Sequence, residues 1–205
     1  MNEPKLQNFE ESAKNYIEKL YTSFSNENYK AIERLANSLQ IAWKEGKFVY
    51  ICGNGGSAAN ALHIANDFHY GIGACGSGNK IPGLKIEALG ANCGVITCLA
   101  NDTGYEHIYS HQLQVKATQG DMLIVLSGSG NSPNVVNALK TAKQIGMESY
   151  SIVAFDGGKC KKLSDLSIHL PIEDMQIAED TQLVVGHICM QWLNLHKPEG
   201  LRALF

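Results

Sequence analysis

Two short loops decide the fold of this chain: Cys52-Gly53-Asn54-Gly55-Gly56-Ser57 and Ser127-Gly128-Ser129-Gly130-Asn131-Ser132. Each loop follows an apolar run, at residues 47–51 and 122–126, and leads into a helical pattern. Short apolar runs are typical of buried strands, and glycines leave backbone N–H groups open to an anion. Two such turns in one small domain predict that one ligand is held from two sides.

The second loop is the stronger signal for phosphate binding. It offers three hydroxyls within six residues, from Ser127, Ser129 and Ser132, and Gly128 lets the backbone approach a ligand closely. The helix that starts at Pro133 adds the positive end of its dipole. The first loop is less specific, because it matches neither the GxGxxG fingerprint nor a Walker loop. An ordinary capped turn between strand and helix is the alternative for both loops.

The composition indicates a folded domain with no general affinity for polyanions. The chain has 205 residues, of which 44% are hydrophobic and 18% charged, so it can bury a full core. Its formal net charge of -3 gives no electrostatic basis for binding nucleic acid or an anionic membrane. Any phosphate must therefore be held locally, by backbone amides and hydroxyls.

The start of the chain and its cysteines predict a cytoplasmic protein. Residues 1–5 are polar and unlike a signal peptide, and no apolar run approaches the ~20 residues that span a bilayer. The six cysteines contain no CxxC pair, and several lie in apolar runs. We therefore expect buried free thiols in a reducing compartment.

Strand-like and helical patterns alternate from residue 47 onward. Apolar runs fall at residues 47–52, 85–90, 121–126, 149–154 and 167–170. Helical stretches fall near residues 57–70, 106–118, 133–145 and 177–196. This alternation predicts an α/β fold, a parallel sheet with helices on both faces. Both loops then lie at carboxyl ends of strands, where such sheets bind ligands.

Two amphipathic helices are expected before the first strand, over residues 6–25 and 29–45. The single domain, residues 1–205, thus consists of N-terminal helices (1–46), an α/β core (47–196) and a tail (197–205). A helical hairpin outside the sheet needs cover for its apolar stripe. Either its own domain or another subunit can provide that cover.

Two groups of polar side chains are candidates for chemistry. His63 and Asp67 are four residues apart, on one face of the helix that begins at the first loop. This spacing suits metal ligation or proton transfer, and also a merely structural hydrogen-bonded pair. Near the end of the chain, His187 lies in an apolar run, eight residues after Glu179 and seven after Asp180. On an ideal helix Asp180 is nearly in line with His187. The alternative to a catalytic role is that His187 is a buried structural histidine with a hydrogen-bond partner.

Together these motifs resemble a known family. They are, in order, residues 53–57, His63, Ala100-Asn101-Asp102, residues 127–132 and Asp156-Gly157-Gly158-Lys159. The set resembles a sugar isomerase (SIS) domain and, within that family, the bacterial phosphoheptose isomerases. The resemblance implies a three-layer α/β sandwich with a five-stranded parallel sheet, the flavodoxin-like SIS fold, and an N-terminal helical hairpin.

The resemblance also implies an activity and an assembly. Phosphoheptose isomerases are homotetramers whose active sites lie between subunits. They convert sedoheptulose 7-phosphate to D-glycero-D-manno-heptose 7-phosphate for lipopolysaccharide and other heptose-containing glycans. The implied partners of this chain are a phosphorylated sugar and further copies of itself, with no nucleic acid and no membrane.

By matched position, the resemblance assigns roles to individual residues. The implied substrate-binding residues are Asn54, Gly55, Gly56, Ser57, Asp102, Ser127, Gly128, Ser129, Ser132 and Glu179. The implied zinc ligands are His63, Asp67, Glu179 and His187. Asp67 is expected to act as the base and His187 as the acid of a proton transfer through an enediol.

Three residues depart from the family pattern. Asp67 stands where the family has Glu, so its carboxylate is one methylene shorter. Glu179 stands where the best-known members have a glutamine zinc ligand, and we follow this family register although the ideal helix favours Asp180. Gly128 replaces a threonine of the phosphate loop.

Two other functions are alternatives to heptose isomerisation. One is the isomerisation of another phosphosugar. The other is a non-catalytic SIS protein that binds a phosphosugar or associates with a replication initiator. Residues 57–61 resemble the corresponding stretch of the initiator-associating SIS proteins. Those relatives lack the catalytic histidine that His187 matches, so the sequence favours an enzyme.

Overall fold

The computed structural model describes residues 8–76 and 79–203, so the first two residues of the predicted helix 6–25 and the last two of the tail lie outside the described residues. Five parallel strands form one sheet in the order β2-β1-β3-β4-β5. They are β1 (Phe48–Cys52), β2 (Lys85–Ala88), β3 (Met122–Ser127), β4 (Glu148–Val153) and β5 (Leu166–His169). Each predicted strand-like run overlaps one of them, which confirms the α/β sandwich. Because the strand order reverses between β1 and β3, the switch point lies between the two glycine loops.

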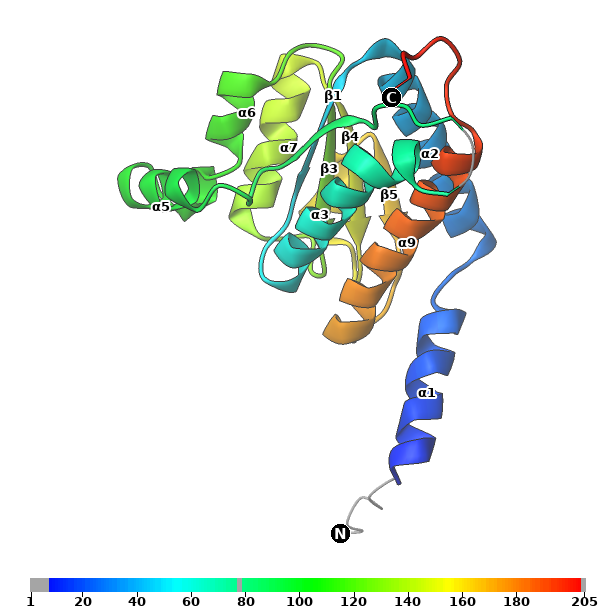
Figure 1. Ribbon diagram of the computed structural model, residues 1–205. Coiled ribbons are helices and arrows are strands. Elements are labelled where there is room, and N and C mark those ends of the chain that lie inside the picture. The colour runs from blue at the N-terminus through cyan, green and yellow to red at the C-terminus, as the bar shows by residue number, and fades with distance from the viewer. Residues whose placement is uncertain (1–7, 77–78, 204–205) are drawn as a thin grey trace.

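Helices cover both faces of the sheet (Figure 1). One face is covered by α2 (Asn26–Glu45), α3 (Gly56–Asn66) and α9 (Met175–Leu195), and the other by α6 (Ser110–Lys116), α7 (Pro133–Ile145) and α8 (Gly158–Leu163). The central strand β3 is buried along its whole length, as expected for a parallel sheet covered on both sides. In the described part of the chain, no helix combines the length and apolar content needed to cross a membrane.

The sequence patterns missed two helices and one change of helix type. Helix α5 (Cys93–Asp102) extends from the body of the protein (Figure 1); Ile96, Leu99 and Ala100 pack against the core but are only partly buried, so its one-sided apolar pattern is weak. Helix α8 has six residues, too few to show a period. The helix predicted to continue to residue 70 changes at Asp67, where α3 passes into a π-helix, η1 (Asp67–Gly71), followed by α4 (Ile72–Ala74).

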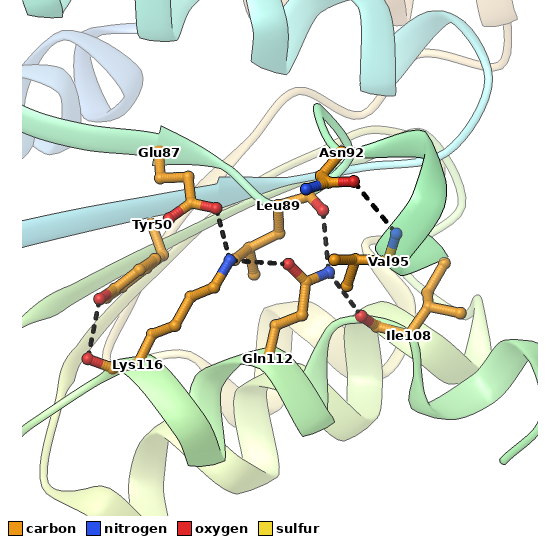
Figure 2. Close-up of polar contacts among 8 residues, drawn as sticks. All are labelled: Tyr50, Glu87, Leu89, Asn92, Val95, Ile108, Gln112 and Lys116. Carbon is orange, nitrogen blue, oxygen red and sulfur yellow. Dashed lines mark hydrogen bonds and ion pairs between the residues drawn. The ribbon is translucent and has the colours of Figure 1, made fainter. Parts of the chain in front are cut away.

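Polar contacts anchor the segment between β2 and α6 to the body of the protein (Figure 2). The buried side-chain amide of Gln112 donates to the carbonyl oxygens of Leu89 and Ile108, at 2.9 and 2.8 Å. The ammonium of Lys116 donates to Glu87 of the edge strand and to Gln112. These contacts fix both ends of the segment that carries α5.

The two N-terminal helices differ in what covers them. The sequence left open whether their own domain or another subunit covers them, and α2 is covered by its own domain, where it buries Leu39 and Trp43 in the core. Helix α1 (Phe9–Thr22) projects from the body (Figure 1), and none of its described residues is buried. The Tyr16 hydroxyl donates to Asp180 at 2.6 Å, and this bond raises the pKa of Tyr16 to about 12. The large apolar side chains that α1 leaves exposed are Phe9, Ile17 and Tyr21.

The cysteines are free thiols, but the expectation that they are buried holds only in part. Cys52, Cys160 and Cys189 are buried, and burial raises the pKa of Cys189 to about 12. Cys75, Cys93 and Cys98 are exposed. The last two lie on α5, none of whose described residues is fully buried.

Candidate active site

The two glycine loops meet in one pocket. A cavity of about 290 Å³ lies at the carboxyl ends of the adjacent strands β1 and β3, beside the first turns of α9. Its lining contains every predicted substrate residue except Asp102, and it adds Leu126 and Met175. The full lining is Asn54, Gly55, Gly56, Ser57, Leu126, Ser127, Gly128, Ser129, Ser132, Met175 and Glu179.

The loops approach each other closely because Gly53 has no side chain. A Cβ at Gly53 would lie only 2.8 Å from the carbonyl oxygen of Leu126. Asn54 and Asn134 then join the loops by a reciprocal pair of amide hydrogen bonds of 2.9 and 2.8 Å. Sequence reasoning missed Asn134, which is buried. Its place just after Pro133, at a helix N-terminus, is a signal shared with many purely structural asparagines.

Two helices begin at the pocket without a capping side chain. Helices α2 and α9 are capped by Ser25 and Asp174, whereas α3 and α7, within the described residues, have no side-chain cap. The first N–H groups of a helix have no acceptor inside it and carry the positive end of its dipole. Gly56 and Ser57 of α3, and Ser132 at the start of α7, line the pocket. The pocket therefore favours an anion without any cationic side chain.

Three pocket hydroxyls each accept one hydrogen bond from within the protein. Ser127 Oγ accepts from the N–H three residues ahead, at 3.1 Å, and Ser129 Oγ accepts from the N–H two residues ahead, at 3.3 Å. Ser57 Oγ accepts from Gln182 Nε2 at 3.0 Å. Since each oxygen already accepts a hydrogen bond, its own proton is available for a ligand oxygen.

A second cluster lies further along α3 and α9. The Nε2 atoms of His63 and His187 are 2.9 Å apart, and Asp67 Oδ2 lies 3.4 Å from His63 Nε2 and 3.5 Å from His187 Nε2. Asp67 is the first residue of the π-helix η1, and short π-helical segments within α-helices occur frequently at functional sites. The structure thus brings together residues that the sequence placed in two separate motifs, 124 positions apart.

This cluster fits a metal ion in both chemistry and spacing. Among the described residues, His63, Asp67 and His187 are the group whose ligand atoms all lie within 4.8 Å of one another. Two imidazoles and a carboxylate are typical donors of a catalytic zinc site with an open position. Zinc–ligand distances of about 2.0–2.2 Å place neighbouring tetrahedral ligands about 3.3–3.5 Å apart. Both contacts of Asp67 match this value, and the two imidazoles are closer together.

Glu179 lies with the phosphate loops and not with the histidines. A Cβ at Gly56 would lie 2.2 Å from Glu179 Oε2, so the carboxylate rests over the first turn of α3. Eight residues separate Glu179 from His187, about 12 Å along a helix axis. Among the described residues, Glu179 is not part of the group formed by His63, Asp67 and His187, and its role as a zinc ligand stays a prediction. Asp180 is not available, because it pairs with Tyr16.

Asp102 lies outside the pocket, on the exposed helix α5. It accepts hydrogen bonds from Asn101 Nδ2 at 2.7 Å and from the Cys98 thiol at 3.5 Å. The segment that follows it does reach the site, because the hydroxyl of Tyr105, in the short 3-10 helix η2 (Tyr105–His107), donates to Asn54 at 3.2 Å. Sequence reasoning did not single out Tyr105, whose exposed position gives no local signal.

Comparison with known proteins identifies the family. The model of the SIS domain family matches residues 13–154. Phosphoheptose isomerases from Helicobacter pylori (34% identity, 91% of this chain and 90% of theirs) and Aneurinibacillus thermoaerophilus (36% identity, 77% of each) are similar in sequence. The solved phosphoheptose isomerase from Neisseria gonorrhoeae, 26% identical, has a TM-score of 0.78 and covers 92% of this chain and 100% of its own. The chain therefore belongs to the SIS domain family and, within it, to the phosphoheptose isomerases.

Proposed function

We propose that this chain interconverts sedoheptulose 7-phosphate and D-glycero-D-manno-heptose 7-phosphate, an aldose–ketose isomerisation through an enediol. The observation that carries the proposal is an anion pocket and an acid–base cluster on the same pair of helices. The phosphoheptose isomerase relatives support the choice of heptose. The product would supply heptose to glycans such as lipopolysaccharide, and free thiols accord with a cytoplasmic location.

The spacing of the two clusters favours a long substrate with its phosphate far from its carbonyl. His63 is six residues after Ser57, which lines the pocket. This separation corresponds to about 9 Å along the axis of α3. A sugar that bridges this gap carries its phosphate several carbons from C1 and C2. A heptose 7-phosphate meets this condition better than a short sugar phosphate does.

The chemistry requires one proton to move between C1 and C2 and others to move between the oxygens. With the phosphate held by backbone N–H groups and serine hydroxyls, the carbonyl end lies at the cluster. Asp67 Oδ2 faces both imidazoles, so the other carboxylate oxygen is left to take the carbon-bound proton. His187 then exchanges protons with the substrate oxygens; with zinc on its Nε2, this exchange would use Nδ1. A zinc ion held by His63, Asp67 and His187 would polarise the substrate carbonyl.

The test is an assay of purified protein with sedoheptulose 7-phosphate, coupled to detection of the aldose phosphate. We expect turnover of the heptulose phosphate with kcat/KM well above that for pentose and hexose phosphates. Higher kcat/KM with one of those sugars would favour the alternative isomerase. Tight binding of sugar phosphates without any turnover would contradict the enzymatic function and favour a binding protein.

The homotetramer is part of the proposal and rests on uncovered apolar surface. Helix α1 and the facing part of α9 line an apolar groove of about 310 Å³ that includes Ile17, Tyr21 and Ile188. Ile188 adjoins His187, so a subunit seated in this groove also approaches the catalytic cluster. Both histidines are about half exposed in the single chain, and such a neighbouring subunit would cover them.

Light scattering of the protein at micromolar concentration should report four chains. The double variant Ile17→Asp with Tyr21→Asp should lower the mass and the activity together, because charges on the stripe oppose its burial. Glu11→Lys is the control and should leave the mass unchanged, because exposed Glu11 lies about 120° from Ile17 and about 80° from Tyr21 around α1. A fully active monomer would contradict both the tetramer and an active site shared between subunits.

A further inference from the structure

A buried chain of side-chain amides connects α9 to Ser57 in the anion pocket. Asn60 Nδ2 donates to the carbonyl oxygen of Glu179 at 2.9 Å and to Gln182 Oε1 at 3.0 Å. Gln182 Nε2 in turn donates to Ser57 Oγ at 3.0 Å. Gln182 is 1% exposed, and Asn60 and Ser57 are also buried, so these bonds are shielded from water.

One carbonyl group determines the direction of every bond in this chain. A backbone carbonyl only accepts, so Asn60 must present its NH₂ group to Glu179, and the same NH₂ group reaches Gln182 Oε1. The amide of Gln182 is thereby oriented with its own NH₂ group toward Ser57. Since Ser57 Oγ is the acceptor of this contact, its proton must point elsewhere.

We propose that Gln182 is a positioning residue that turns the Ser57 hydroxyl proton into the pocket, where it donates to an anionic oxygen of the substrate phosphate. The inference rests on the proposed function, because it assumes a phosphate in this pocket. Hydrogen bonds to charged acceptors are about twice as strong as neutral ones, and a donor oriented before binding needs no reorientation. Gln182 acts only through Ser57, since it does not line the pocket.

The test is a double-mutant cycle on sulfate binding to the assembled full-length protein, measured by calorimetry. Gln182→Met removes the amide donor, keeps a similar side-chain length and adds no charge, and Asn60 retains its bond to Glu179. We expect Ser57→Ala to weaken sulfate binding about ten- to hundredfold, the range for a hydrogen bond to a charged group. Gln182→Met should weaken it about tenfold, and the double variant no more than Ser57→Ala alone.

Each outcome separates this inference from the proposed function. If Gln182→Met weakens sulfate binding equally with and without the Ser57 hydroxyl, it acts through the packing of α9 and the inference is wrong. Unchanged binding in Gln182→Met together with weakened binding in Ser57→Ala refutes the inference and leaves the pocket intact. If the wild-type protein does not bind sulfate, the anion pocket and the proposed function fail, and the inference fails with them.

A second variant keeps the test decisive if Gln182→Met lowers the melting temperature too far. Gln182→Glu has the same shape, but at neutral pH its carboxylate accepts the Ser57 proton and turns it away from the pocket. We expect Gln182→Glu to weaken sulfate binding more when Ser57 is present than in the Ser57→Ala background, where only charge repulsion is left. Equal losses in the two backgrounds would overturn the proposal.

Discussion

Asp67→Asn should lower the kcat of the isomerisation by about 10²–10⁴-fold, the usual contribution of a general base. The amide keeps the size of the carboxylate but cannot take a proton from carbon. The anion pocket should bind sulfate as in the wild-type protein, because Asp67 is not among its lining residues. Steady-state kinetics with sedoheptulose 7-phosphate, with calorimetry of sulfate binding beside it, measures both effects.

Asp67→Glu is the matched control, because it introduces the glutamate that the family resemblance implies at this position and keeps a base. Asp67 Oδ2 lies at nearly equal distances from both histidines, 3.4 and 3.5 Å, so an added methylene moves the carboxylate past this position. We expect Glu to retain activity well above Asn but below the wild-type level. If Asp67→Asn is fully active with unchanged KM, the cluster is a structural pair and the assignment of the base is wrong.

His187→Ala should have an effect of similar size, about 10²–10⁴-fold on kcat. The histidine is the only member of the cluster contributed by α9 among the described residues, so its loss removes both the proposed acid and one donor to a metal. Zinc content, measured by elemental analysis, should fall from roughly one per chain to a small fraction, since three protein donors are typical of such sites. Removal of zinc from the wild-type protein by a chelator should lower kcat, and added zinc should restore it.

Two further variants distinguish the roles of His187. His63→Ala should also lose zinc, but with zinc in excess it should recover more activity than His187→Ala, because the proposed acid is still present. His111→Ala removes an exposed histidine on α6, on the opposite face of the sheet, and should change neither zinc content nor kcat. If His187→Ala retains zinc and full activity, both proposed roles are refuted.

Asp67, which stands where the family resemblance implies glutamate, is also the residue at which the α-helix changes to a π-helix. The N–H of Ile72 donates to the Asp67 carbonyl, five residues back, so the helix widens directly after the shorter carboxylate. This places the irregular turn within the cluster itself. The effect of Asp67→Glu on kcat therefore also reports whether the chain is adapted to aspartate at this position.

Local patterns in the sequence were sufficient for the elements that position the site. A buried parallel strand is a continuous apolar run, so β1 and β3 could be located within one or two residues. Glycine and serine after such a run indicate a tight turn into a helix, and both loops lie where this rule places them. Helix α5 was missed because it is short and its apolar side chains, Ile96, Leu99 and Ala100, are only partly buried.

The contacts that form the site were decided only by the tertiary structure. Which of Glu179 and Asp180 faces the pocket depends on the rotation of α9 against α3 and α1. The ideal helix favoured Asp180, which pairs with Tyr16, whereas the residue given by the family register, Glu179, lines the pocket. The bonds from Asn134 to Asn54 and from Gln182 to Ser57 join residues 80 and 125 positions apart. Sequence patterns report the period of burial along one element. The packing of that element on its neighbours sets which polar side chains meet, because a rotation of one residue, about 100°, turns a side chain from the pocket to solvent.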